Sequence, residues 1–333
     1  MRVWEITGDG IDRLALADRP SLAPGPRQLR FRVDAVALNY RDLSTVKAAG
    51  ARGLALPLVP CADAAGEVVE VGADVDELAP GDRVVSCFFQ RWSDGPCTPD
   101  AMATALGGAV DGVLADEVTL EADGVVPAPP HLTPAEAATL TTAGVTAWNA
   151  TAHIAAMKPG ETLLLLGTGG VSIFALQFAR LLGVRAIVTS KSDAKLARAR
   201  ELGAWATLNY AREPDWDRAV LDLTAGAGAD ATLEVGGAGT LERSIRATRV
   251  AGTIVLVGIL TGGAIDPVAI MRKSLRLQGL YVGPRAVFLA MTRAVAAHEL
   301  RPVIDRRFPF AEAPDAFRAL EAQDHLGKIV VER

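Results

Sequence analysis

Residues 161–190 read ETLLLLGTGGVSIFALQFARLLGVRAIVTS, and this stretch decides the fold. It begins with four consecutive leucines after Thr162, a run typical of a strand that is covered on both faces, as in parallel sheets. Apolar residues then recur at helical spacing over residues 171–182, which predicts a helix packed on that sheet. A second apolar run ends at Ser190. The stretch therefore predicts a strand, a helix and a second strand of one sheet.

Glycines connect the first of these strands to the helix in the sequence GTGGVS at residues 167–172. Such a turn lets the pyrophosphate of a dinucleotide approach backbone N–H groups at a helix N-terminus, where the helix dipole favours an anion. Ser172 takes the place of the third glycine of the G-x-G-x-x-G pattern, which allows close packing of helix on strand, and a serine is small enough for that role. A plain strand-to-helix connection is the alternative reading of the glycines alone.

Length, charge and cysteine content narrow the class of protein. The chain has 333 residues, half of them apolar, so about two well-packed domains are expected. Its net charge of −5 argues against nucleic acid as a main partner, because phosphate binding needs a basic face. The first residues form neither a signal-peptide core nor a membrane span. Three cysteines without a C-x-x-C pair indicate reduced thiols, so we expect a cytoplasmic protein with no membrane contact.

The chain changes character along its length. Residues 1–126 show short alternating strands separated by Pro-Gly turns, which predicts a small barrel or sandwich. Residues 90–116 predict a long loop of the kind that often serves function. Thr133 and Glu136 form a capping box that starts a helix. Strands and helices then alternate from residue 161 onward, which predicts a doubly wound parallel sheet.

The C-terminal part contains one more helix after Gly258, a sixth strand at residues 275–280, an amphipathic helix at 314–322 and a last strand at 328–331. No helix follows this last strand, so we expect it to return to the first domain. We place the nucleotide-binding domain at residues 127–263 and the other domain at residues 1–126 and 264–333.

Five segments in this order resemble the medium-chain dehydrogenase/reductase superfamily, and most closely its zinc-independent, quinone-oxidoreductase-like branch. They are NYRD at 39–42, PCADAAGEV at 60–68, PGDRV at 80–84, GTGGV at 167–171 and LGKIV at 326–330. The resemblance covers essentially the whole chain. It implies an α/β fold in which a GroES-like, partly open β-barrel catalytic domain is interrupted by a doubly wound Rossmann nucleotide-binding domain.

The resemblance also locates the positions at which zinc members of the superfamily hold their catalytic metal. Such a site needs three ligands chosen from Cys, His and carboxylate. Here Asn39 stands in place of the first cysteine, Ala62 in place of the histidine, and no cysteine lies near Gly144. The four cysteines of a structural zinc lobe are missing too. We therefore expect no metal, and a quinone or α,β-unsaturated carbonyl suits such a site because its own oxygen delocalises the arriving charge.

The second strand of the sheet indicates which nicotinamide cofactor binds. NAD enzymes end this strand with an acidic residue that accepts a hydrogen bond from the ribose 2′-OH. Here the strand ends in Ser190 and Lys191, and Lys195 follows one helical turn later. Hydroxyl and ammonium groups bind a 2′-phosphate, so we predict NADPH. Tyr210 matches a tyrosine that contacts this phosphate in the resembled family. The alternative is that both lysines are ordinary solvated residues at a helix start.

The resemblance assigns further cofactor contacts by position. Those near the pyrophosphate and the glycine turn are Thr146, Gly167, Gly169, Gly170 and Val171, and those near the nicotinamide are Gly258 and Ile259. Tyr281 and Val282, after the sixth strand, are further candidates. Tyr281 fits a core aromatic residue equally well.

The substrate pocket is expected at Asn39, Tyr40 and Asp42. In the resembled branch the asparagine and tyrosine of Asn-Tyr-x-Asp face the nicotinamide. Tyr40 is a candidate to bind the substrate oxygen or to donate the proton that follows hydride transfer, and solvent is the alternative donor. We expect Asp42 to hold the backbone or Arg41 rather than to react.

These observations predict an NADPH-dependent, zinc-independent reductase that transfers hydride to a quinone or an enone. Two alternatives stay open: an alcohol dehydrogenase or ketone reductase of the same superfamily, and a non-catalytic NADPH-binding protein with a structural or regulatory role. The expected partner is a small-molecule substrate. The resemblance also implies a homodimer formed through the sixth strand of the Rossmann sheet, with a tetramer left open.

Overall fold

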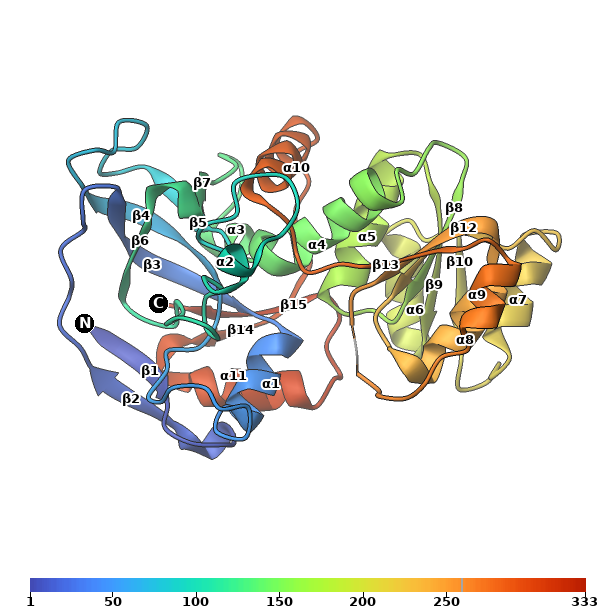
Figure 1. The fold of residues 1–333 in the computed structure, drawn as a ribbon, viewed down its shortest axis with the longest axis horizontal. Helices are drawn as coiled ribbons and strands as arrows, with labels where there is room; N and C mark the ends of the chain where they lie inside the picture. The colour runs from blue at the N-terminus through green and yellow to red at the C-terminus, as the bar shows by residue number, and fades with distance from the viewer. Residues whose placement is uncertain (259) are drawn as a thin grey trace. The chain divides into compact units, whose positions relative to one another are not determined.

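The computed structural model of this chain describes residues 1–258 and 260–333. These residues form two compact units (Figure 1): Met1–Val145 together with Gly283–Arg333, called the catalytic unit below, and Thr146–Val282, called the nucleotide unit. The predicted boundaries at 126/127 and 263/264 are corrected by this division. Helix α3 (Pro134–Ala138) contacts strands of the catalytic unit, so residues 127–145 belong to that unit. The sixth strand pairs within the sheet of the nucleotide unit, so residues 264–282 belong to the nucleotide unit.

The nucleotide unit is built on a six-stranded sheet in the order β10-β9-β8-β11-β12-β13. Every neighbouring pair is parallel. In chain order the strands run 3-2-1-4-5-6, the arrangement of a doubly wound Rossmann sheet, so the predicted fold is confirmed. The strands are β8 (Thr162–Leu166), β9 (Arg185–Ser190), β10 (Ala206–Asn209), β11 (Ala229–Glu234), β12 (Thr248–Leu256) and β13 (Arg276–Gly279).

Apolar side chains hold this unit together. The leucines of β8 are buried, as expected for a strand covered on both faces, and they pack with Ile187, Leu208 and Trp216. Parallel strands need crossover connections, which helices supply here. The helices are α5 (Gly170–Leu181), α6 (Asp193–Glu201), α7 (Trp216–Leu223), α8 (Ala238–Ala247) and α9 (Pro267–Arg272).

The catalytic unit contains a seven-stranded sheet and a separate two-stranded one. The large sheet follows the path β14-β15-β3-β4-β5-β7, and β6 pairs with β3 off this path. Its strands are β3 (Gln28–Leu38), β4 (Asp63–Val71), β5 (Arg83–Ser86), β6 (Glu117–Glu121), β7 (Val125–Pro127), β14 (Ile304–Pro309) and β15 (Lys328–Glu332), and the small sheet pairs β1 (Arg2–Ile6) with β2 (Leu14–Asp18). The last strand, red in Figure 1, lies antiparallel to β3, so its predicted return to the first domain is confirmed.

Short helices complete the catalytic unit. Thr133 and Glu136 form the predicted capping box at the start of α3. The segment predicted as a long loop, residues 90–116, contains one short helix, α2 (Pro99–Met102). The other helices are α1 (Tyr40–Ala48), α10 (Arg285–Ala297) and α11 (Ala313–Glu321), and the unit boundary falls at the start of α4 (Val145–Trp148). Across the residues that the structure describes, every helix is too short or too polar to cross a membrane.

Candidate functional site

The glycine turn after β8 has the geometry of an anion cradle. Gly167 has a φ of 71°, a conformation that favours glycine, and Gly169 is the N-cap of α5. A Cβ added at Gly167 or Gly169 would meet nothing within 4 Å, so the space above the turn is not filled by the described part of the protein. Gly170 and Val171 open α5, and the first N–H groups of a helix lack intrahelical acceptors. These residues fit the pyrophosphate of a dinucleotide.

Ser172 makes a hydrogen bond at this turn in addition to being small enough for close packing. Its hydroxyl is buried and donates to the carbonyl oxygen of Leu166, the last residue of β8, at 2.7 Å. Close packing of helix on strand is therefore present without the third glycine. The hydrogen bond fixes the N-terminal turn of α5 against the end of the strand.

The end of β9 carries the residues predicted to bind a 2′-phosphate. Ser190 is the last residue of the strand, and its carbonyl oxygen accepts from the backbone N–H of Tyr210 at 3.2 Å. The side chain of Lys191 is exposed, and that of Tyr210 is 40% exposed. The structure thus brings Ser190, Lys191 and Tyr210 together at one edge of the sheet. Lys195 lies in the first turn of α6, where its N–H donates to the N-cap hydroxyl of Ser192.

Asp193 is the nearest acidic residue in sequence to this edge, and its carboxylate is already engaged. It accepts from the side-chain amide of Asn209 at 2.7 Å and forms an ion pair with Arg212. Its position in the first turn of α6 is also the place where a helix favours a negative charge. Asp193 therefore serves the helix and the neighbouring loop.

Glu234 is a residue of this edge that the sequence did not single out. It ends β11 and is fully buried, and its carboxylate accepts hydrogen bonds from the N–H groups of Gly236 and Gly237 and from the hydroxyls of Thr240 and Ser244. A carboxylate at the end of an apolar strand, shortly before two glycines, is the sequence signal that could have indicated Glu234. It fixes the turn into α8.

The remaining predicted cofactor residues are placed less tightly around this edge. An added Cβ at Gly258 would lie 2.2 Å from the carbonyl oxygen of Val235, so glycine lets the ends of β11 and β12 approach closely. Ile259 lies outside the described residues. Thr146 is buried, and the carbonyl oxygen of Val282 accepts a hydrogen bond from the Asn149 side chain. Among the described residues, no hydrogen bond joins either of them to the glycine turn. Tyr281 is 45% exposed, so its alternative reading as a core residue is wrong.

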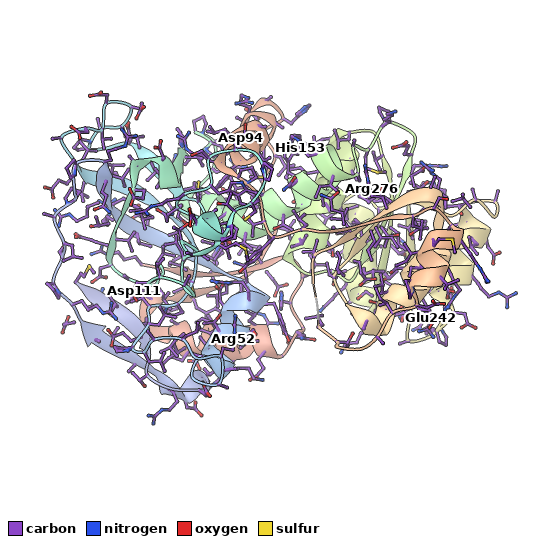
Figure 2. The ribbon with its side chains drawn as sticks, in the orientation of Figure 1. Arg52, Asp94, Asp111, His153, Glu242 and Arg276 are labelled. Carbon is purple, nitrogen blue, oxygen red and sulfur yellow. The ribbon has the colours of Figure 1, made fainter. Side chains whose placement is uncertain are left out.

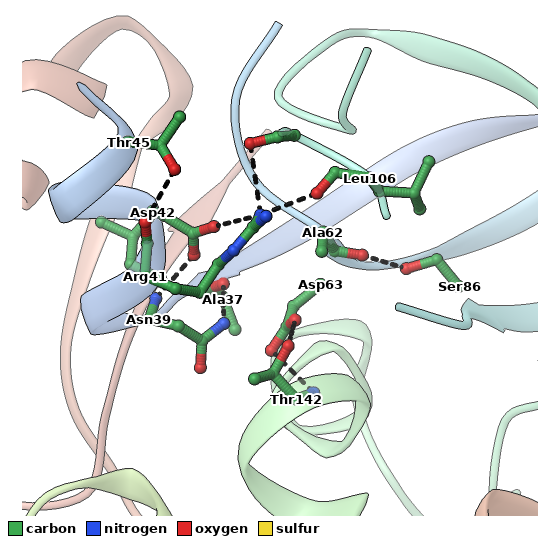
Figure 3. A network of polar contacts seen from close by, with 12 residues as sticks. Ala37, Asn39, Arg41, Asp42, Thr45, Ala62, Asp63, Ser86, Leu106 and Thr142 are labelled. Carbon is green, nitrogen blue, oxygen red and sulfur yellow. Dashed lines mark hydrogen bonds and ion pairs between the residues drawn. The ribbon is translucent and has the colours of Figure 1, made fainter. Parts of the chain in front are cut away.

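In the catalytic unit, Asn39, Tyr40 and Asp42 form the first turn of α1. Asn39 is the N-cap, and its N–H donates to Asp42 Oδ2 at 2.8 Å. Asp42 is fully buried, and its other oxygen accepts from Arg41 Nη1 at 3.2 Å (Figure 3). The expectation that Asp42 holds the backbone and Arg41 is confirmed. The side chain of Tyr40 is 49% exposed, so it is the member of this turn most open to a ligand.

A buried polar cluster lies beneath this turn and was not predicted. Lys328 Nζ donates to the Leu38 carbonyl oxygen at 2.7 Å and to Asn39 Oδ1 at 2.6 Å, and it lies 3.6 Å from Asp63 Oδ2. Thr142 donates to Asp63 through both its hydroxyl and its N–H. Figure 3 shows Asp63 facing Thr142. Both charged residues stand in otherwise apolar segments, and that pattern is the sequence signal for the cluster.

Burial sets the charges of this cluster. It raises the pKa of Asp63 to about 6, although the neighbouring Lys328 ammonium acts in the opposite direction. Burial also lowers the pKa of Lys328, against the effect of Asp63. The side-chain oxygen of Asn39 is occupied by Lys328, and its nitrogen faces the Ala37 carbonyl oxygen at 3.5 Å. Asn39 is therefore tied into the cluster and positions the start of α1.

The residues at the family's zinc positions do not fit a metal ion. Ala62 offers no ligand atom, and the Lys328 ammonium holds the side-chain oxygen of Asn39. Within residues 1–258 and 260–333, no group of three or more His, Cys, Asp or Glu side chains is arranged to hold a metal. Cys61 and Cys87 are buried, and burial raises the pKa of Cys87 to about 12, which keeps that thiol protonated at neutral pH.

Comparison with known proteins agrees with this architecture. Residues 25–130 match the family model "Alcohol dehydrogenase GroES-like domain", and residues 170–297 match "Zinc-binding dehydrogenase". The chain is 39% identical over 314 residues to the "Zinc-type alcohol dehydrogenase-like protein C1773.06c" of Schizosaccharomyces pombe, an alignment that covers 92% of this chain and 91% of the relative.

Two solved structures are similar along the full length of the chain. The first, an "NAD-dependent alcohol dehydrogenase", shares 33% identity with a TM-score of 0.91, and 100% of both chains is covered. The second, mycobacterial Rv1454c complexed with NADPH, shares 26% identity with a TM-score of 0.84, again over 100% of both chains. With its GroES-like catalytic unit, its Rossmann sheet and these relatives, the chain belongs to the medium-chain dehydrogenase/reductase superfamily of oxidoreductases.

Proposed function

We propose that this protein is an NADPH-dependent, zinc-independent reductase that transfers hydride to a quinone or an α,β-unsaturated carbonyl compound. One observation carries the choice of acceptor: the family's metal position holds Ala62 and the Lys328–Asn39 hydrogen bond instead of metal ligands. Without a Lewis acid, a simple ketone is hard to polarise, whereas a conjugated acceptor spreads the arriving charge over its own oxygen. NADPH, when bound, supplies the hydride.

The choice of NADPH is supported by the end of β9. Ser190, Lys191 and Tyr210 adjoin there, and the nearby acid Asp193 is paired with Arg212. Hydroxyl and ammonium groups suit a 2′-phosphate. The double variant Ser190→Asp/Lys191→Ala should raise the KM for NADPH far more than the KM for NADH. Equal changes in the two values would contradict the assignment, and a wild-type preference for NADH would do so directly.

Tyr40 is the proposed contact to the acceptor. It is half-exposed at the first position of α1, where Asn39 and Asp42 fix the backbone. Its hydroxyl can bind the acceptor oxygen or donate the proton that completes the reduction. Tyr40→Phe should lower kcat if the hydroxyl donates this proton. An unchanged kcat would leave solvent as the proton source and Tyr40 as a packing residue.

A spectrophotometric assay of NADPH oxidation with a panel of quinones and enones tests the function as a whole. Turnover of at least one conjugated acceptor is expected, and it should survive treatment with a metal chelator. Tight NADPH binding without turnover would instead support a non-catalytic protein. The names of the relatives favour alcohol oxidation or ketone reduction as the second candidate, and chelator-sensitive activity on an alcohol would establish it.

We also propose that two copies associate through β13. This strand pairs with β12, and the described residues place no strand on its other side. Exposed apolar side chains lie near this edge in sequence, including Val268, Met271 and Tyr281. An open edge with apolar neighbours suits strand pairing between copies. Light scattering during size-exclusion chromatography should report a dimer, and a monomer at micromolar concentration would refute this arrangement.

A further inference from the structure

Arg41 joins the start of α1 to a segment that is distant in sequence. Its Nη1 donates to the carbonyl oxygens of Leu106 at 2.7 Å and Gly107 at 3.2 Å, as well as to Asp42. Its guanidinium also lies over the ring of Phe88, 4.7 Å from the ring centroid. Figure 3 shows the side chain spanning from α1 to Leu106. The Arg41 guanidinium therefore contacts Phe88, which follows β5, as well as Leu106 and Gly107, which follow α2.

The segment that Arg41 holds is a compact turn at residues 105–110, called the 105–110 turn below. It closes on itself through backbone hydrogen bonds from Ala109 and Val110 to the Ala105 carbonyl oxygen. The N–H of Leu106 donates to the Phe88 carbonyl oxygen, so the same peptide region is held by Phe88 on one side and by Arg41 on the other. The carbonyl groups that face Arg41 thus belong to a turn with little freedom of its own.

The anchor is rigid because each of its parts is fixed. Asp42 is fully buried, accepts from the N–H of Asn39 and supplies the counter-charge for Arg41. Arg41 Nη1 carries two N–H groups, so one of them is shared among its three acceptors, while the guanidinium plane covers the ring of Phe88. A lysine ammonium can serve the oxygens, but it lacks the planar group that stacks on the ring of Phe88. An added Cβ at Gly108 would lie 2.7 Å from Arg41 Nη2, which shows how closely the turn covers the guanidinium.

This anchor lies directly beside the proposed acceptor contact. Arg41 follows Tyr40 in the first turn of α1, and its side chain is 21% exposed. The 105–110 turn is thus held by the residue that follows Tyr40 in the chain, and its Val110 is exposed.

We propose that Arg41 is a positioning residue that sets acceptor selectivity by holding the 105–110 turn against the start of α1. The proposal rests on the reductase function proposed above. With Arg41 in place the turn stays against the start of α1 and supports small acceptors. Without it the turn moves away, so small acceptors lose contacts while bulky ones lose little.

The test compares Arg41→Met and Arg41→Lys with the control Arg52→Met. Arg52, labelled in Figure 2, follows the same helix, and its guanidinium donates to the Thr45 hydroxyl. The kcat/KM is measured for a small cyclic enone and for a bicyclic quinone. In Arg41→Met the ratio of the two values should shift roughly tenfold toward the bulky quinone, the scale of lost hydrogen bonds to a charged group. The KM for NADPH should stay unchanged, Arg41→Lys should recover only part of the shift, and the control should show none.

Hydrogen exchange supplies a readout that does not need turnover. Amides of residues 105–110 should exchange faster in Arg41→Met than in Arg52→Met or the wild type, whereas those of residues 112–114, which donate to carbonyl oxygens of residues 59–61, should not change. Gly108→Ala crowds the same guanidinium without removing it, and it should give a smaller selectivity shift in the same direction. This variant tests the proposal even if Arg41→Met fails to fold.

The outcomes separate the two proposals. A wild type that reduces both acceptors, with variants that lose activity equally on both and exchange normally, would overturn the positioning role and leave the reductase function intact. Unchanged selectivity in Arg41→Met and in Gly108→Ala would do the same. A wild type that reduces no acceptor would overturn the proposed function, and this inference with it.

Discussion

Replacing Lys328 by methionine should strip a buried carboxylate of its counter-charge. Asp63 is fully buried and Lys328 is 3% exposed, and their charged atoms lie 3.6 Å apart. Removing one partner of such a pair costs about 3–5 kcal/mol of unfolding free energy. The lysine also donates to Leu38 and Asn39, whose oxygens lose that donor. The two hydrogen bonds from Thr142 to Asp63 remain and offset part of the loss, so we expect about 4 kcal/mol.

Thermal and urea unfolding of Lys328→Met measure this cost. Because the chain has two units, a single midpoint does not report one transition, so hydrogen exchange of the β15 amides identifies the unfolding of the catalytic unit. The matched control is the double variant Lys328→Met/Asp63→Asn, which removes both charges at nearly constant volume. It should be clearly more stable than Lys328→Met. A single variant as stable as the wild type, or a double variant no better than the single one, would refute the reasoning.

The pH dependence of the same variant follows from the pKa of Asp63. Folding raises this pKa from 3.8 to about 6, so between these values the native state binds more protons than the unfolded state. Protonation of Asp63 therefore favours the folded state as the pH falls through this window. Loss of Lys328 removes an interaction that lowers this pKa, so the window should widen upward. The deficit of Lys328→Met should be smaller at pH 5 than at pH 8, and a deficit that grows toward acid would contradict this account.

Three further predictions concern stability elsewhere in the fold. Burial raises the pKa of Glu136, but hydrogen bonds from the N-cap residue Thr133 and from Arg301 outweigh this effect, so the net pKa is lowered. The stability that the Glu136 carboxylate contributes is therefore present at neutral pH and lost on acidification. In thermal unfolding, Glu136→Gln should cost about 1 kcal/mol at pH 7 and less at pH 3. Ser172→Ala deletes the hydrogen bond to Leu166 and should cost about 1 kcal/mol in unfolding of the nucleotide unit, while no change would make the bond dispensable. Lys273 donates to three carbonyl oxygens at the C-terminal end of α8. Lys273→Met should therefore speed amide exchange in the last turn of α8 and lower the free energy of unfolding by about 1–2 kcal/mol. Equal exchange rates in the variant and the wild type would disprove this effect.

The sequence by itself determined the features that depend on neighbours along the chain. The leucine run predicted a buried parallel strand, and Thr133 with Glu136 predicted a capped helix, because strand burial and helix capping follow from residue spacing over a few positions. The glycine turn and the strand–helix alternation predicted the Rossmann sheet for the same reason. The position of Asp42 in its turn was also predictable, because its partners are Asn39 and Arg41.

Only the tertiary structure decided which distant residues meet. Lys328 reaches Asn39 across 289 positions of sequence, and Arg41 reaches Leu106 across 65. No local pattern encodes these contacts, because they depend on β15 pairing with β3 and on the turns that follow β5. These contacts stabilise the fold because a buried polar or charged group without a partner costs free energy, so the lysine, the aspartate and the two carbonyl groups each need one. The sequence therefore determined the elements and the glycine turn of the Rossmann sheet, whereas the packing of the catalytic unit decided which polar groups surround the start of α1.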